Sequence, residues 1–281
     1  MLRATWELSA SLALALFAAY GLLRLVGVAG RPRVTTLASF FVQFGVVVAI
    51  FAVYQRTSLH RLDLTAGAEQ RALWVWDVEQ RLRMGSELAI QRWVLPFPTL
   101  VRGLNAYYAG LHLTSMTAFL VWMWWRHRAH YLLACVTVAG TTLISVLLHN
   151  VSVAPPRLLS ELGFVDTGLL YGQSVYGPAG TGISSQLAAM PSLHVAWAGI
   201  IAGFALVVSA SRWRWLLVGH FAMTCFVVVA TANHWWLDGV AGLLIAWGVY
   251  AVARLLLPSP GALTGTRADI DADAAAAVPA P

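Results

Sequence analysis

The sequence predicts an all-α polytopic membrane protein, and three observations support this prediction. The chain is 59% hydrophobic and 11% charged, whereas a typical soluble domain contains roughly 25% charged residues. It contains 13 tryptophans, a residue type that is enriched at membrane–water interfaces. Seven apolar stretches approach the length of about 20 residues that a membrane-crossing helix needs. They span residues 6–28, 35–54, 104–125, 131–149, 191–209, 213–231 and 235–257.

The two ends of the chain differ in character. The first stretch follows a single basic residue, Arg3, and precedes six others, so we interpret it as a membrane span and not as a cleaved signal peptide. Residues 1–257 are then expected to form one integral-membrane domain. Residues 258–281 are rich in alanine, proline and aspartate and contain few large apolar groups, which predicts a disordered tail.

The segment 68–94 has a pattern of its own between the second and third stretches. It alternates large apolar residues, such as Trp76 and Trp93, with acidic and basic ones. This pattern fits an interfacial amphipathic helix that is broken near Gly85. A small extramembrane helical cap fits it equally well, and both interpretations stay open.

Arginine placement predicts the orientation. Three short connections are basic, and such connections face the cytoplasm by the positive-inside rule. They contain Arg24, Arg31 and Arg33, then Arg126 and Arg128, then Arg212 and Arg214. Residues 56–102 also carry arginines, but long connections report topology poorly. We therefore expect an outside N-terminus, an inside C-terminus, and residues 150–190 and 232–233 on the extracytoplasmic face of the cell membrane.

The net charge does not indicate a nucleic-acid partner, and the two cysteines do not indicate a disulfide. All 18 basic residues are arginines and the formal net charge is +6. Topology and anionic lipid account for this charge, so we expect a lipid bilayer and no nucleic acid as partner. Cys135 and Cys225 both lie in apolar runs, and we interpret them as small core residues and not as a disulfide framework.

A histidine and an aspartate four positions apart, His234 and Asp238, open the last apolar stretch. Asp238 is the only acidic residue between Asp166 and Asp269, and a carboxylate within a membrane marks a functional site by default. Positions four apart share one helix face, so we expect Asp238 to accept a hydrogen bond from one nitrogen of His234. That bond would make the other nitrogen a better nucleophile or base. A purely structural His–Asp pair is the alternative.

A second histidine motif, Pro191-Ser192-Leu193-His194, opens the fifth apolar stretch. Proline is favoured at the first helical position, so we expect a helix that begins at Pro191. Its first N–H groups, those of residues 192–194, would then be free to bind an anion. With the hydroxyl of Ser192 and the imidazole of His194, this pattern predicts a phosphate-binding helix start. A capped helix start with an interfacial histidine is the alternative.

Arg157 is the third candidate, and it is the only basic side chain other than histidine between Arg128 and Arg212. A guanidinium binds phosphate bidentately and stays charged. The predicted orientation places Arg157 outside, where the positive-inside rule does not place an arginine that merely sets topology. We therefore expect Arg157 and the two histidine motifs to converge on one face.

These three motifs, in this order and each at the end of a predicted membrane helix, resemble those of the type 2 phosphatidic acid phosphatase (PAP2) superfamily. Residues 189–196 and 234–238 are most similar to its inositol-phosphorylceramide synthase branch, which transfers an inositol phosphate headgroup. The motif-bearing part covers residues 150–242. The resemblance implies the six-helix bundle of that superfamily, here with one additional span, and a membrane phosphatase or phosphotransferase.

The resemblance also implies a role for each motif residue. His234 would be the nucleophile that attacks phosphorus and forms a phosphohistidine, and Asp238 would orient it. His194 would protonate the leaving alkoxide and then deprotonate the incoming water or alcohol. Arg157 and Ser192 would bind phosphate oxygens. In-line phosphoryl transfer mainly requires positioning and charge stabilisation, so neither a metal nor another cofactor is implied.

The chain departs from the superfamily pattern at three positions. Asn150 stands where the pattern has a lysine, Leu158 where it has a proline, and Val228 where it has an arginine. The loss of two cations favours a phosphodiester or a bulky lipid headgroup over a terminal phosphate dianion, because less charge must be neutralised. His149, beside Asn150, can supply a replacement charge when protonated, and both are candidate substrate-binding residues.

Two further regions are open to two interpretations each. Tyr107, Tyr108 and His112 lie at the start of the third stretch and form either a packed interfacial patch or part of a headgroup pocket. Residues 161–189 are rich in glycine and form either a lid over the site or a long loop.

The function predicted from these residues is cleavage of a membrane lipid phosphoester at an outward-facing site. No motif decides between water and an alcohol as acceptor. One alternative is a proton-coupled transporter or flippase-like protein in which His234 and Asp238 relay protons. Another is a metal or haem protein with His149, His194 and His234 as its ligands. The clustering of ionisable groups at one face favours the enzyme.

Overall fold

The computed structural model describes residues 6–25, 67–175 and 186–257, together with short runs and single residues between 38 and 56. In these ranges every regular element is helical, and only an isolated bridge joins Val153 to Ala188. The prediction of an all-α fold is confirmed. The predicted tail 258–281, part of the predicted second span and residues 176–185 of the predicted lid lie outside the described residues.

The described helices follow the predicted stretches in order, and the amphipathic segment is divided in two. They are α1 (Trp6–Leu25), α3 (Ala68–Arg81), α4 (Glu87–Val94), α5 (Pro98–Arg126), α6 (Arg128–Leu148), α7 (Thr167–Leu170), α8 (Leu193–Val208), α9 (Arg214–Ala230) and α10 (Trp236–Leu256). Two 3-10 turns, η3 (Pro156–Leu158) and η4 (Ser160–Leu162), precede α7. The division between α3 and α4 confirms the predicted break near Gly85.

Three described helices, α1, α6 and α10, are long and apolar enough to cross a membrane. Helices α8 and α9 are apolar but contain 16 and 17 residues. At 1.5 Å per residue these two measure roughly 25 Å, which is less than a hydrocarbon core of about 30 Å. An integral-membrane protein is thus supported, and the count of seven spans stays a prediction.

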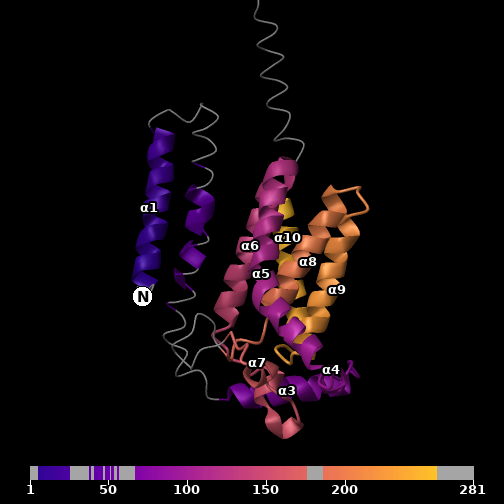
Figure 1. Ribbon diagram of the computed structural model, residues 1–281. Coiled ribbons are helices and arrows are strands. Elements are labelled where there is room, and N and C mark those ends of the chain that lie inside the picture. Colours follow the sequence, from indigo (N-terminus) through magenta and orange to yellow (C-terminus); the bar gives the residue numbers. More distant parts are fainter. Residues whose placement is uncertain are drawn as a thin grey trace, which may run out of the picture.

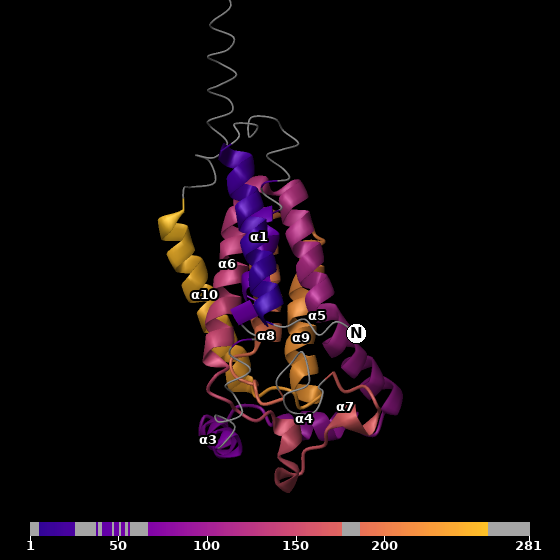
Figure 2. The ribbon, with the colours of Figure 1, turned by 90° about the vertical axis from the view of Figure 1, so that its left-hand side faces the viewer.

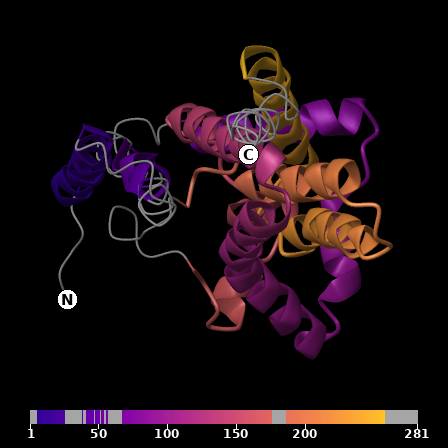
Figure 3. The ribbon, with the colours of Figure 1, turned by 90° about the horizontal axis from the view of Figure 1, so that it is seen from above.

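Helices α5, α6, α8, α9 and α10 form a bundle in which α8 packs against the other four (Figure 3). Large apolar side chains fill the space around α8, among them Phe119 and Met123 of α5 and Ile201 and Phe204 of α8 itself. Helix α1 stands to one side of this bundle (Figure 1). The central position of α8 places its first residues between the ends of α6, α9 and α10.

The start of α8 lies against α10 because Gly242 has no side chain. A Cβ atom at Gly242 would lie 2.4 Å from the backbone oxygen of Ser192. The Ser192 N–H donates to the backbone oxygen of Asp238 at 2.8 Å. The two histidine motifs, about 40 residues apart in sequence, are thereby joined through their backbones.

Helices α3, α4 and α7 lie across one end of the bundle (Figures 1 and 2). One side of α3 packs on that end, where Ala72 and Val75 are buried with Trp235. The other side exposes Trp74, and α4 exposes Trp93. The amphipathic segment therefore packs as a helical cap and also presents tryptophans, as interfacial helices do.

Candidate active site

His234 lies in the short connection between α9 and α10 and is 5% exposed. Its Nδ1 atom donates a hydrogen bond to the backbone oxygen of Ala189 at 2.8 Å and lies 3.3 Å from Oδ2 of Asp238. Because both neighbours are acceptors, Nδ1 carries the proton and Nε2 presents its lone pair. The Nε2 atom is buried and has no hydrogen-bond partner among the described residues. The ring is thus held through one nitrogen while the other stays available.

The predicted contact between His234 and Asp238 is present, and Asp238 makes a second contact as well. Its Oδ2 atom also accepts a hydrogen bond from the Trp235 N–H at 2.9 Å. This bond satisfies one of the N–H groups that the first turn of a helix leaves without a helical partner. Asp238, which is fully buried, therefore joins the ring of His234 to the first turn of α10.

The surroundings of His234 keep its imidazole neutral. Burial and the nearby positive charge of Arg157 lower the pKa of His234 to about 4, while the bond to the Ala189 carbonyl acts in the opposite direction. The native protein therefore keeps His234 unprotonated at pH 7. A neutral imidazole retains the lone pair that a nucleophile requires.

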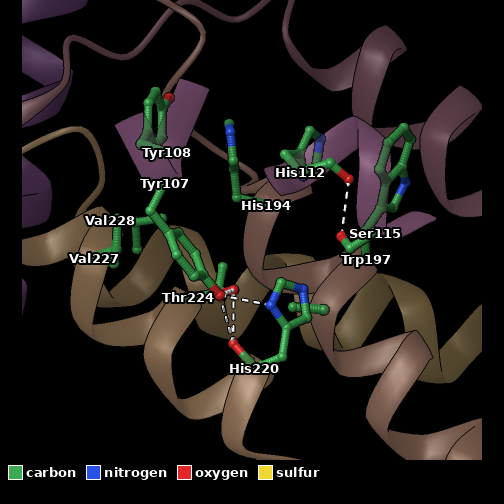
Figure 4. A pocket seen from close by; sticks show the side chains of 11 residues that line it. Tyr107, Tyr108, His112, Ser115, His194, Trp197, His220, Thr224, Val227 and Val228 are labelled. Atoms are coloured by element: carbon green, nitrogen blue, oxygen red, sulfur yellow. Dashed lines mark hydrogen bonds between the residues drawn. The ribbon is translucent and has the colours of Figure 1, made fainter. Parts of the chain in front are cut away.

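His194 occupies the first turn of α8, and its ring centroid lies 5.5 Å from that of His234. It lies between Tyr108 and His112 of α5 (Figure 4), with ring centroids 4.2 Å and 4.0 Å away. His112 in turn stacks on Trp197 at 4.4 Å. The predicted aromatic patch is therefore packed against His194, and it also lines a hollow beside that residue.

The predicted helix start at Pro191 is wrong by two residues. Ser192 is the N-cap of α8, and its Oγ accepts a hydrogen bond from the Val195 N–H at 3.4 Å. The Ser192 N–H, which we expected to be free for an anion, donates to the Asp238 backbone oxygen. Because α10 lies so close to this turn, the Ser192 N–H is bonded to α10 and is not free to bind an anion. Binding of phosphate by Ser192, whose side chain is fully buried, stays a prediction.

Arg157 is buried in the 3-10 turn η3 and lies close to the connection that carries His234. Its backbone N–H donates to the Ala232 carbonyl at 2.9 Å. Its Nε atom lies 3.2 Å from Oδ2 of Asp166, which also caps α7. Arg157 and Asn233 line one hollow. The structure thus brings Arg157 close to the connection that carries His234, and it adds Asp166, which the sequence did not single out.

His149 and Asn150 have other contacts. The Nε2 atom of His149 donates to the Pro191 carbonyl at 3.0 Å, which ties the end of α6 to the turn before α8. The side-chain amide of Asn150 donates to the Leu147 carbonyl at 2.8 Å. Neither residue is among the described residues that line the hollow beside Arg157. A direct phosphate-binding role for either stays a prediction.

If the phosphoester cleavage predicted from the sequence is correct, replacing Arg157 with lysine is expected to lower kcat/KM by about 10²-fold. Lysine keeps the charge but lacks the planar fork that contacts two phosphate oxygens at once. Steady-state kinetics on purified protein measures the change, and Arg81→Lys is the matched control because Arg81 is an exposed arginine paired with Asp77. Equal kcat/KM for Arg157→Lys and wild type would remove Arg157 from the site.

The fold and the site together define a class: a membrane-type helix bundle with two adjacent histidines, a carboxylate and a buried arginine at one end. The model of the PAP2 superfamily matches residues 73–252. The chain therefore belongs to the PAP2 superfamily, whose members are generally phosphoesterases. No curated protein and no solved structure matches the chain. The matched range contains every candidate residue, while assignment to the inositol-phosphorylceramide synthase branch stays a prediction.

Proposed function

We propose that the protein is an integral-membrane lipid phosphatase or phosphotransferase that cleaves a lipid phosphoester through a phosphohistidine at His234. One observation carries this proposal. The Nδ1 atom of His234 is bonded to the Ala189 carbonyl and close to Asp238, while the buried Nε2 atom has no partner among the described residues. An imidazole held in this way directs its lone pair at an incoming phosphorus atom. Membership of the PAP2 superfamily supports the same chemistry.

In the first step, Nε2 of His234 attacks phosphorus and the bond from phosphorus to the leaving oxygen breaks. Protonated His194 gives its proton to that oxygen, so the leaving group departs as an alcohol. Arg157 holds the phosphate oxygens and stabilises their charge. The product of this step is a phosphohistidine and a neutral His194.

In the second step, His194 takes a proton from water or from an alcohol, and the resulting oxygen nucleophile attacks the phosphohistidine. The bond between phosphorus and nitrogen breaks, and His234 returns to its neutral state. Water gives hydrolysis, and an alcohol gives transfer of the phosphoryl or phospho-headgroup. Both outcomes use the same residues, so the acceptor alone distinguishes phosphatase from phosphotransferase.

We place the site on the extracytoplasmic face of the cell membrane. The short arginine-bearing connections between α5 and α6 and between α8 and α9 lie at the opposite end of the bundle (Figure 1). The positive-inside rule assigns that end to the cytoplasm. The lipid then enters from the outer leaflet.

The position of Val228 supports a substrate of low charge. The superfamily pattern has an arginine here, but Val228 is 2% exposed and packs in an apolar cluster. Its carbonyl accepts the N–H groups of Asn233 and His234. No cation enters the site from this position.

The residues around Arg157 support a phosphodiester with a hydroxylated headgroup. Asn105, Gln173 and Asn233 line the hollow beside it. These neutral amides donate and accept hydrogen bonds, as hydroxyl groups require, and add no charge. A phosphodiester has one negative charge fewer than a monoester dianion, which suits the one arginine among the described residues that line this hollow.

The test is turnover of a panel of lipid phosphomonoesters and phosphodiesters with matched chains, in detergent with EDTA. We expect kcat/KM for the better diester to exceed that for the matched monoester by about 10-fold or more, because an unpaired buried charge is strongly unfavourable. A clear preference for monoesters would contradict the diester assignment. Loss of all turnover in EDTA would contradict the metal-free chemistry.

A further inference from the structure

The first turn of α10 is held by carboxyl groups from two other helices. The Leu237 N–H donates to Oε1 of Glu79 at 2.7 Å, and the Trp236 N–H donates to Oε1 of Glu87 at 3.4 Å. Glu79 belongs to α3 and Glu87 to α4, 158 and 149 residues before their partners. Both bonds involve N–H groups that the first turn of a helix leaves without a helical partner. They lie directly beside the N–H that Asp238 accepts.

Both glutamates are fully enclosed. Glu79 is 1% exposed and Glu87 is 0% exposed. Glutamate is almost never buried to this extent unless it is paired, and neither forms an ion pair with an arginine or histidine of the described chain. An amphipathic surface helix places its glutamates on the exposed face. Because Glu79 and Glu87 are instead buried against α10, we infer that they have a specific role there.

The carboxyl groups of Glu79 and Glu87 influence each other's ionisation. The Oε2 atoms of Glu79 and Glu87 are both buried and have no hydrogen-bond partner among the described residues. Burial and the proximity of the Glu87 and Asp238 carboxyl groups raise the pKa of Glu79 to about 9, while the bond from the Leu237 N–H acts in the opposite direction. Glu79 is therefore protonated and neutral at pH 7.

We propose that Glu79 and Glu87 are positioning residues that hold the first turn of α10 and thereby keep His234 and Asp238 in the geometry for attack on phosphorus. This inference rests on the proposed function of His234. Asp238 lies in that first turn and contacts the His234 ring at 3.3 Å, so a shift of the turn moves the nucleophile. A displacement of 1 Å at a reacting group lowers the rate by about 10²-fold.

The break between α3 and α4 completes the support of α10. The backbone oxygen of Gly85 accepts a hydrogen bond from the Trp236 indole Nε1 at 2.6 Å. On the other side, Trp76 of α3 packs against the Trp235 ring, with centroids 5.8 Å apart. The amphipathic segment thus supports the first turn of α10 and also packs on the end of the bundle.

The test compares Glu79→Leu, Glu79→Gln and wild type, with Glu69→Gln as a control for an exposed carboxylate of the same helix. We expect Glu79→Leu to lower kcat by about 10²-fold with little change in KM, because leucine cannot accept the Leu237 N–H. Glu79→Gln is expected to keep kcat near wild type at pH 7, since its amide oxygen can accept from the Leu237 N–H and its side chain is neutral, like the protonated glutamate.

The pH profile supplies a readout that a purely structural role does not move. Glu79 loses its proton as the pH rises through about 9, which places a negative charge on Glu79 beside the carboxyl groups of Glu87 and Asp238 at one helix turn. Wild-type kcat is expected to fall there, whereas Glu79→Gln keeps its activity. The free energy of unfolding is also expected to fall as the pH rises from about 4.5 to about 9. Over this range the folded protein keeps the proton on Glu79, whereas the unfolded chain has already lost it.

Two results would overturn the positioning role: wild-type kcat in Glu79→Leu, or the same alkaline fall in Glu79→Gln as in wild type. If Glu79→Leu does not fold, the comparison of Glu79→Gln with wild type still decides. The same assay on His234→Ala separates this inference from the proposed function. Activity in His234→Ala contradicts the phosphohistidine, while an inactive His234→Ala beside unaffected Glu79 variants contradicts only the positioning role.

Discussion

Replacing His234 with alanine is expected to lower kcat for the preferred lipid phosphoester by about 10⁴-fold or more, since loss of a nucleophile removes the covalent route entirely. The buried Nε2 atom is the one nitrogen of His234 with no partner among the described residues. Alanine leaves Arg157 and His194 in place, but nothing attacks phosphorus. Steady-state turnover in detergent measures the loss.

A matched control shows whether the loss of turnover is due to His234 itself and not to replacing any histidine. His130 lies near the start of α6, at the end of the bundle opposite the site (Figure 1), so His130→Ala is expected to retain wild-type kcat. Thermal unfolding of both variants shows whether each is folded. A folded His234→Ala protein with more than a few per cent of wild-type turnover would exclude His234 as nucleophile.

Replacing His194 with alanine is expected to lower kcat by about 10³-fold for a lipid alkoxide leaving group, within the usual range for a general acid. A p-nitrophenyl ester needs no proton on its leaving group, so its first step is affected much less. The second step still needs a base to activate water. We therefore expect a burst of p-nitrophenol followed by slow turnover.

The leaving-group comparison separates acid–base chemistry from packing. His194 stacks on Tyr108 at 4.2 Å, so its removal also disturbs a packed row of rings. A packing defect slows both leaving groups alike and gives no burst. Equal losses for the alkyl and p-nitrophenyl esters would therefore refute the role of His194 as general acid.

The contact between His234 and Asp238 could be predicted because the two residues are only four positions apart. Their contacts with residues far away in the sequence could not be predicted. A histidine and an aspartate four apart share a helix face whatever the rest of the fold does. The Ala189 carbonyl lies 45 residues away in sequence and belongs to a residue without any functional group. In the sequence, Glu79 and Glu87 have the pattern of exposed charged residues in an amphipathic helix. Only the tertiary structure shows that they are buried.

The errors at helix ends have physical causes. Pro191 was expected to begin a helix because proline suits that position, but the Ser192 N–H is bonded to α10 and the helix begins at Leu193. Helix α5 begins at Pro98, six residues before the predicted span at 104. The polar residues Thr99 and Arg102 lower the hydropathy there but do not prevent a helix.

The number of membrane spans could not be derived from apolar length alone. The fifth and sixth predicted stretches each included residues that the structure places in caps and connections, so α8 and α9 are shorter than expected. Hydropathy reports the apolar character of a stretch and not where its helix ends. The site depends on the order and ends of these helices, and these were predicted correctly to within a few residues.

The most direct test of the account is detection of phosphorus covalently bound to His234. His194→Ala protein is mixed with the preferred phosphoester, quenched at alkaline pH to preserve phosphohistidine, digested and analysed by mass spectrometry. We predict a phosphoryl or phospho-headgroup modification on His234 in a large fraction of the protein, and none in the double variant His194→Ala/His234→Ala. Turnover by wild type without any such modification, or a modification on another residue, would contradict the account.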